Sequence, residues 1–122
     1  MTPDEHRDEL ARRMAARDLD GTLQLIGDDA VYFWSNGEAL FGKEAIADGL
    51  RRNFEGIQND TFETFDVTWL ARSDDVAVCV YRFRWTGEVD GKTVGGRGRG
   101  TSALRCIDGQ WQTVHEHLSA GE

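Results

Sequence analysis

RGTSALRCIDGQWQTVHEHLS, residues 99–119, reads as two alternating strands joined by a tight turn. The turn is Asp108-Gly109, a pair that tolerates the positive backbone φ angles of a two-residue hairpin. With these two residues in the turn, Ser102 is predicted to lie opposite His115. Side chains alternate between the two faces of a strand. The face on which we expect any chemistry therefore carries Gly98, Gly100, Ser102, Leu104, Cys106, Trp111, Thr113, His115 and His117.

The preceding run, residues 76–89, alternates just as clearly. Its large aromatic side chains all fall on one face, and such a face belongs in the core. The opposite face alternates valine with arginine and should face solvent or a partner. The predicted inner residues are Ala77, Cys79, Tyr81, Phe83 and Trp85, and the predicted outer residues are Val76, Val78, Val80, Arg82 and Arg84.

The first half of the chain has helical patterns and one short pair of strands. Gly27 is a typical stop after a helix, and Asn36-Gly37 favours a hairpin turn. Helices that come first, followed by a long meander of strands, indicate an α+β fold. We expect a curved antiparallel sheet wrapped around three helices, forming a cone with a central pocket. The predicted helices cover residues 4–17, 19–26 and 43–54, and the first predicted strands cover residues 30–35, 38–41 and 61–73.

Length and charge narrow the classes of function. The chain has 122 residues, a net charge of −8 and two cysteines. One domain, residues 1–122, is expected at this length. The acidic balance argues against a nucleic-acid partner, and no apolar run is long enough to span a membrane. Without a secretory leader pattern or a disulfide framework, a cytoplasmic location is expected.

The chain resembles the SnoaL-like and ketosteroid-isomerase-like group of the nuclear-transport-factor-2-like superfamily, which has the cystatin-like cone fold. RDLDGTLQLIGDDAVYF at 17–33, FGKEAIADGL at 41–50 and the stretch from Gly98 to Ser119 carry this resemblance. The resemblance implies the fold, while the function stays open, because this fold hosts isomerases, cyclases, dehydratases, hydrolases and non-enzymatic association modules.

The residues of ketosteroid isomerases are not found at the matching positions. The base aspartate of that group corresponds to Trp34, the oxyanion-hole tyrosine to Leu10, and the second aspartate to Ser102 or a neighbour. Steroid isomerisation by that mechanism is therefore disfavoured. No cofactor is expected.

His115 and His117 are the predicted catalytic residues, because a histidine titrates near neutral pH and i, i+2 residues of a strand point the same way. Three interpretations stay open: pocket-wall residues, acid/base catalysts beside Ser102 or Tyr81, and ligands of a metal. We predict no metal site, since a metal needs three or four ligands. The residues predicted to line a ligand pocket are Tyr32, Trp34, Phe54, Trp69, Tyr81, Phe83, Trp85, Ser102 and Trp111.

Two functions follow as hypotheses. The first is binding of a small hydrophobic or cyclic molecule in an apolar pocket, with isomerase, cyclase or dehydratase-type acid/base chemistry. The second is a non-catalytic dimerisation or association module whose cavity is filled by side chains. The valines among arginines on the outer sheet face, together with the resemblance, predict a homodimer through that face. The glycine-rich run 95–100 is expected to be a flexible or strongly bent strand.

Overall fold

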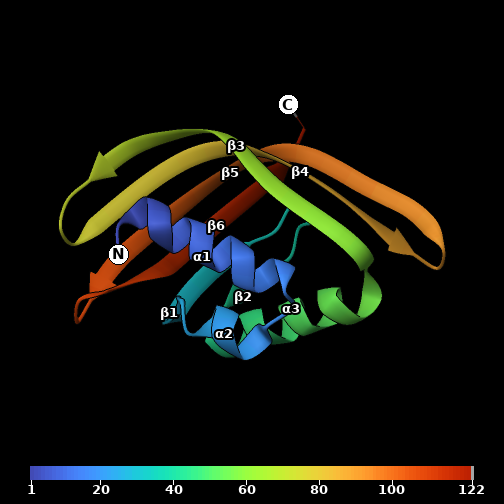
Figure 1. Ribbon diagram of the computed structural model, residues 1–122, viewed down its shortest axis with the longest axis horizontal. Helices are drawn as coiled ribbons and strands as arrows, with labels where there is room; N and C mark the ends of the chain where they lie inside the picture. The colour runs from blue at the N-terminus through green and yellow to red at the C-terminus, as the bar shows by residue number, and fades with distance from the viewer. Residues whose placement is uncertain (122) are drawn as a thin grey trace.

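The computed structural model describes residues 1–121, in which six strands form one curved sheet and three helices lie on its concave side (Figure 1). The α+β class and the cone-like curvature are confirmed. The helices are α1 (Pro3–Ala15), α2 (Leu19–Leu23) and α3 (Lys43–Gly56), and the strands are β1 (Ile26–Phe33), β2 (Ala39–Phe41), β3 (Gln58–Arg72), β4 (Val76–Val89), β5 (Lys92–Ile107) and β6 (Gln110–Ala120).

The sheet has the strand order β2-β1-β6-β5-β4-β3. Neighbouring strands are antiparallel except β1 and β6, which are parallel, so that the sheet is mixed. The long strands β3, β4 and β5 arch over the helices in Figure 1 and continue past them. Within residues 1–121, no helix has the length and apolar character that a membrane span requires.

Local sequence explains where α1 begins and how it is held. Thr2 is the N-cap, and its side chain and that of Glu5 form a reciprocal capping box. Asp4 in the first turn accepts a hydrogen bond from Trp69 Nε1 at 2.9 Å and forms an ion pair with Arg72 at 2.9 Å. These contacts attach the beginning of α1 to the far end of β3.

The second helix is shorter than predicted because the chain joins the sheet earlier. The predicted helix covers residues 19–26, whereas α2 ends at Leu23 and Ile26 already belongs to β1. The Leu25 carbonyl oxygen accepts a hydrogen bond from the Thr113 amide at 2.9 Å. Ile26 is then fully buried against Ile46 and other core residues below the sheet. Pairing with β6 therefore takes precedence over the local helical pattern.

Each aromatic ring on the inner face of β4 lies opposite a glycine of β5. Tyr81 pairs with Gly100, and the next two rungs repeat this arrangement. A Cβ atom added at Gly100 would lie 2.3 Å from Tyr81 Cζ. The glycine-rich run is therefore a regular paired strand whose missing side chains leave room for the rings. The strand pairs with β4 along this run and bends with the arch of the sheet (Figure 1). The other two pairs are Phe83 with Gly98 and Trp85 with Gly96.

A bulge in β6 changes the predicted hairpin register. Leu104 pairs with Thr113 as predicted, but Ala103 pairs with His115, so Val114 is an extra residue in β6. Ser102 consequently lies opposite Glu116. The predicted pairing of Ser102 with His115 is wrong, because an alternating pattern reverses its faces after one inserted residue.

Replacing Gly100 by alanine is expected to destabilise the protein by about 1–3 kcal/mol, because the new methyl group would overlap the Tyr81 ring. Gly56→Ala is the control, since nothing lies within 4 Å of a Cβ at that position. Urea unfolding of both variants measures the difference. Equal stability of the two variants would contradict this account of the glycine run.

Candidate functional site

The bulge brings Glu116, not the two histidines, onto the concave face. Ser102 Oγ donates a hydrogen bond to Glu116 Oε2 at 2.6 Å, from the neighbouring strand. His115 and His117 share the outer register with Ala103 and Thr101. Their predicted position in the pocket is therefore wrong, and the geometric basis for their catalytic role is lost.

Glu116 holds a buried carboxyl group that is only partly satisfied. Its Oε1 is shielded from solvent and has no hydrogen-bond partner among the described residues. Burial raises the pKa of Glu116 from 4.5 to about 8, and the nearby Arg7 charge only partly offsets this by lowering it. The carboxyl group is thus mostly protonated at neutral pH and can donate a hydrogen bond.

Arg7 of α1 supplies the positive charge at this site. Its guanidinium lies over the ring of Tyr81, 4.6 Å from the ring centroid, in cation–π geometry. Its charge acts on Glu116 and also on Cys79, a buried neighbour of Tyr81 on β4. In the described part of the chain, no carboxylate forms an ion pair with Arg7. The first half of α1 therefore places a cation on an aromatic ring of the concave face, and its charge lowers the pKa of Glu116.

A second polar group lies beside Glu116 on the same face. His6 is fully buried, and its Nε2 lies 2.9 Å from Thr113 Oγ1. Burial lowers the pKa of His6 to about 4, so its ring is neutral at physiological pH. Tyr32 is hydrogen-bonded to Thr113 as well, and burial raises its pKa well above the ordinary value. His6 and Tyr32 thus form a neutral network around Thr113.

The predicted pocket residues lie on the concave side but do not form one cluster. Tyr32 and Trp34 pack with the helices, while Trp111 packs beneath the far end of the sheet. Phe54 belongs to α3, where the Arg17 guanidinium lies over its ring. The group nearest to Ser102 and Arg7 consists of Cys79, Tyr81 and Phe83, with Trp69, Trp85 and Leu118 packed against them.

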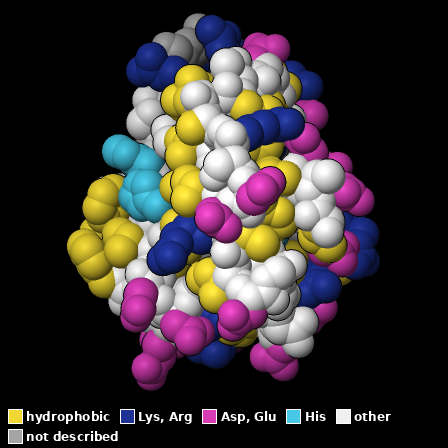
Figure 2. All heavy atoms as spheres, turned by 90° about the vertical axis from the view of Figure 1, so that its left-hand side faces the viewer, with side chains coloured by type: hydrophobic (Ala, Val, Ile, Leu, Met, Phe, Trp, Pro, Cys, Tyr) yellow, Lys and Arg dark blue, Asp and Glu magenta, His cyan; other side chains and the backbone are white. Residues whose placement is uncertain are grey.

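On the outer face of β6, the two histidines pack against the ring of Phe33. His115 Nδ1 donates a hydrogen bond to the Val31 carbonyl oxygen at 2.6 Å. The Phe33 ring makes edge contacts with His115 at 5.3 Å and with His117 at 5.4 Å between centroids. Figure 2 shows histidine side chains beside a hydrophobic group on the surface, and since His6 is buried these belong to β6. The histidines thus form part of a surface patch.

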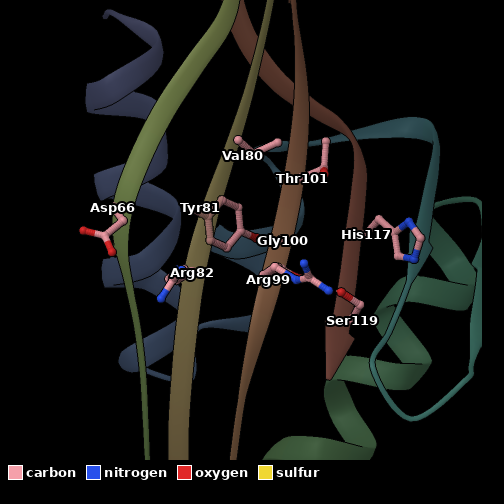
Figure 3. A pocket seen from close by; sticks show the side chains of 9 residues that line it. All are labelled: Asp66, Val80, Tyr81, Arg82, Arg99, Gly100, Thr101, His117 and Ser119. Carbon is pink, nitrogen blue, oxygen red and sulfur yellow. The ribbon is translucent and has the colours of Figure 1, made fainter. Parts of the chain in front are cut away.

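The same face contains an open hollow of about 460 Å³. Figure 3 shows that Arg99 reaches toward Ser119 on β6, while His117 points away from both arginines of the hollow. The guanidinium groups of Arg82 and Arg99, which lie on directly opposite residues, do not converge on one point. The residues around the hollow are Asp66, Val80, Tyr81, Arg82, Arg99, Gly100, Thr101, His117 and Ser119.

Glu116, Ser102 and Arg7 on the concave face have the side chains that acid/base chemistry requires. Glu116 can give a proton to a bound molecule or take one from it. Ser102 orients the Glu116 carboxyl group, and Arg7 can balance a negative charge that develops on the bound molecule. Sequence reasoning missed Glu116 and Arg7. The face to which an acidic residue of an alternating strand points changes when the register shifts by one residue, so the pattern alone does not place Glu116. Nothing in the helical pattern distinguishes Arg7 from the exposed arginines of α1.

Glu116→Gln is expected to stabilise the protein increasingly as the pH rises from 5 to 9. Folding raises the pKa of Glu116 from 4.5 to about 8, so the folded state keeps a proton that the unfolded chain loses. Wild-type stability therefore falls over this range, by up to about 1.4 kcal/mol per pH unit, and glutamine removes this dependence. His6 acts at the other end, because its lowered pKa reduces stability as the pH falls from 6.5 toward 4.

Urea unfolding of wild type and Glu116→Gln at pH 5, 7 and 9 measures this effect. A difference in unfolding free energy that stays constant across the three pH values would show that Glu116 is ionised normally in the folded state.

A family model described as a SnoaL-like domain matches residues 5–121. Among curated proteins, the comparison finds no match. A nuclear-transport-factor-2-like protein of unknown function from Pseudomonas putida KT2440 is 25% identical, with a TM-score of 0.82, over 97% of this chain and 83% of that chain.

Two further structures have the same fold. A ketosteroid isomerase-like protein from Erwinia carotovora atroseptica SCRI1043 is 20% identical, with a TM-score of 0.80, over 98% of this chain and 93% of that chain. A nuclear transport factor 2-like superfamily protein from Salmonella enterica serovar Typhimurium LT2 is 17% identical, with a TM-score of 0.84, over 97% and 87% of the two chains. The family match covers nearly the whole described chain, and we conclude that the chain belongs to the SnoaL-like family.

Proposed function

We propose that the protein binds a small hydrophobic or cyclic molecule on the concave face of the sheet and that Glu116 performs acid/base chemistry on it. One observation carries the proposal: a buried carboxyl group has one oxygen held by Ser102 and the other without a partner. A buried polar group without a partner is costly for stability. Such a cost is typical of a group that is kept for function.

The ionisation of Glu116 suits this role. An acid or base works best when its pKa lies near the pH at which it operates, and the pKa of Glu116 is about 8. Trp69 and Trp85, which are only partly buried where they pack against Tyr81 and Phe83, offer aromatic surface to a flat ligand. Membership of the SnoaL-like family is consistent with isomerase, cyclase or dehydratase-type chemistry. The predicted pocket residues Trp69, Trp85 and Ser102 keep their proposed role in contacting this ligand.

A thermal-shift screen with aromatic and polycyclic compounds tests binding. We expect compounds that raise the melting temperature of wild type, and we expect Glu116→Gln to bind them while losing at least about 100-fold in any turnover, the usual cost of removing a general acid or base. Glu55→Gln makes the same change on an exposed part of α3 and should match wild type.

Two outcomes would count against the proposal. The absence of any stabilising compound would favour the alternative, an association module with a filled interior. Turnover that survives in Glu116→Gln would show that another group performs the chemistry.

We further propose that two copies pair through the outer sheet face. Val76 is 42% exposed and Phe41 is 68% exposed, and the Phe33 rings and histidines of β6 lie between β2 and β5 on this face. Arginines of β4 and β5 bring positive charge to this face of a chain whose net charge is −8. Two acidic chains repel each other least when they meet on such a face.

Val78→Glu is expected to shift the protein toward monomer in sedimentation experiments. Val78 lies opposite Ala71 and Ala103, so no arginine directly across the sheet can neutralise the new charge. A two-fold contact would bring two such charges into a desolvated interface. Val89→Glu at the end of β4 is the control. A wild-type protein that sediments as a monomer at micromolar concentration would contradict the pairing.

A further inference from the structure

The open hollow on the outer sheet face is lined by charged side chains of both signs that form no ion pair within residues 1–121. These are Asp66 of β3, Arg82 of β4 and Arg99 of β5 (Figure 3). Resting on the proposed pairing of two copies through this face, we propose that the hollow is the charged centre of that contact. Asp66 of each copy forms an ion pair with Arg99 of the other.

The two arginines of the hollow need a negative charge from outside their own strands. Arg82 and Arg99 lie directly opposite each other, an arrangement in which like charges destabilise a sheet. Both side chains are exposed. Two residues further along β4, Arg84 lies opposite Glu63 and forms an ion pair with it. Arg82 has no such match, because Phe65 lies opposite it.

A bulge in β3 explains why Asp66 does not supply this match. The pairing of β3 with β4 shifts between Phe65 and Thr68, and Asp66 within this segment has a positive φ of 54°. A bulge re-aims a side chain of its strand. Figure 3 shows the Asp66 carboxylate directed away from Arg82 and Arg99, although all three residues line the same hollow. The acid and the arginines of one copy are therefore available to another molecule.

The presence of both signs in one hollow favours a second copy of the chain over a small anion. A small anion would be attracted by the two arginines but repelled by Asp66 on the same rim. A surface with both signs can match itself in a two-fold pair, because every contact between unlike residues of the two copies then occurs twice. The hollow therefore matches a second copy of itself.

The strand order gives the direction of the two-fold axis. β4 lies between β3 and β5, so an axis along β4 places β3 of each copy over β5 of the other. Phe65, Arg82 and Arg99 form one row across these three strands, and Asp66 follows Phe65. Asp66 of each copy thus comes opposite Arg99 of the other. The two Arg82 side chains lie at the axis, with an aspartate on either side.

Two charge reversals test this contact by sedimentation. Asp66→Arg and Arg99→Asp should each weaken the dimer by about tenfold or more, because each reversal brings like charges together at both contacts. An equimolar mixture of the two variants should form mixed dimers. In these, the introduced arginine meets the introduced aspartate, and the native Arg99 meets the native Asp66. A fluorophore on one of the two variants detects the mixed dimer.

Two further variants control for backbone strain and for general effects of charge. Asp66→Asn removes the charge with a residue that tolerates the same positive φ, and it should weaken the dimer by about threefold or more. Arg51→Asp reverses an exposed charge on α3, on the concave side of the sheet, and should pair as wild type does.

The outcomes separate this contact from the pairing itself. A wild-type dimer that neither charge reversal weakens, or a mixture that forms no mixed dimer, would overturn the contact between Asp66 and Arg99. The pairing through the outer face then stands if Val78→Glu still dissociates the dimer. A wild-type protein that sediments as a monomer would overturn both the contact and the pairing.

Discussion

One inserted residue in β6 controls the chemistry of the concave face. β6 is paired on both sides, antiparallel to β5 and parallel to β1, so its two registers must be compatible. The bulge at Val114 falls where the pairing with β1 is also irregular: Thr113 pairs with Ile26 of β1, and His115 pairs with Val31. Beyond the bulge every side chain changes face, which turns Glu116 inward and both histidines outward.

The inward turn of Glu116 has consequences for stability and function. A carboxylate moved from water into the interior costs several kcal/mol unless it is protonated or paired. Glu116 takes the first solution, with Ser102 as its hydrogen-bond donor. His6 solves the same problem by staying neutral beside Thr113. The interior therefore has an uncharged acid and an uncharged base. Glu116 lowers the stability of the fold as the pH rises, and His6 lowers it as the pH falls.

The aromatic surface and the cation depend on separate structural supports. The glycines of β5 make room for the rings of β4, and Tyr81 can lie flat across the sheet only because Gly100 has no side chain. Arg7 reaches that ring because the beginning of α1 is attached to β3 through Asp4. The candidate site thus depends on α1, β4 and β6, three elements that are far apart in the sequence.

Local patterns in the sequence determined the fold class, the three helices, the Asp108-Gly109 turn and the inner face of β4. Each of these features depends on residues that are a few positions apart: capping residues for the helices, two adjacent residues for the turn, and alternating side chains for the inner face of β4. The aromatic part of the candidate site, from Tyr81 to Trp85, was predictable for that reason. The end of α2 and the bulge at Val114 were not, because the pairing of β1 with β6 sets the first and the pairing of β5 with β6 sets the second. An inserted residue leaves no mark on an alternating pattern until a distant strand fixes the register. Only the tertiary structure could therefore place Glu116 inside and bring Arg7 to it.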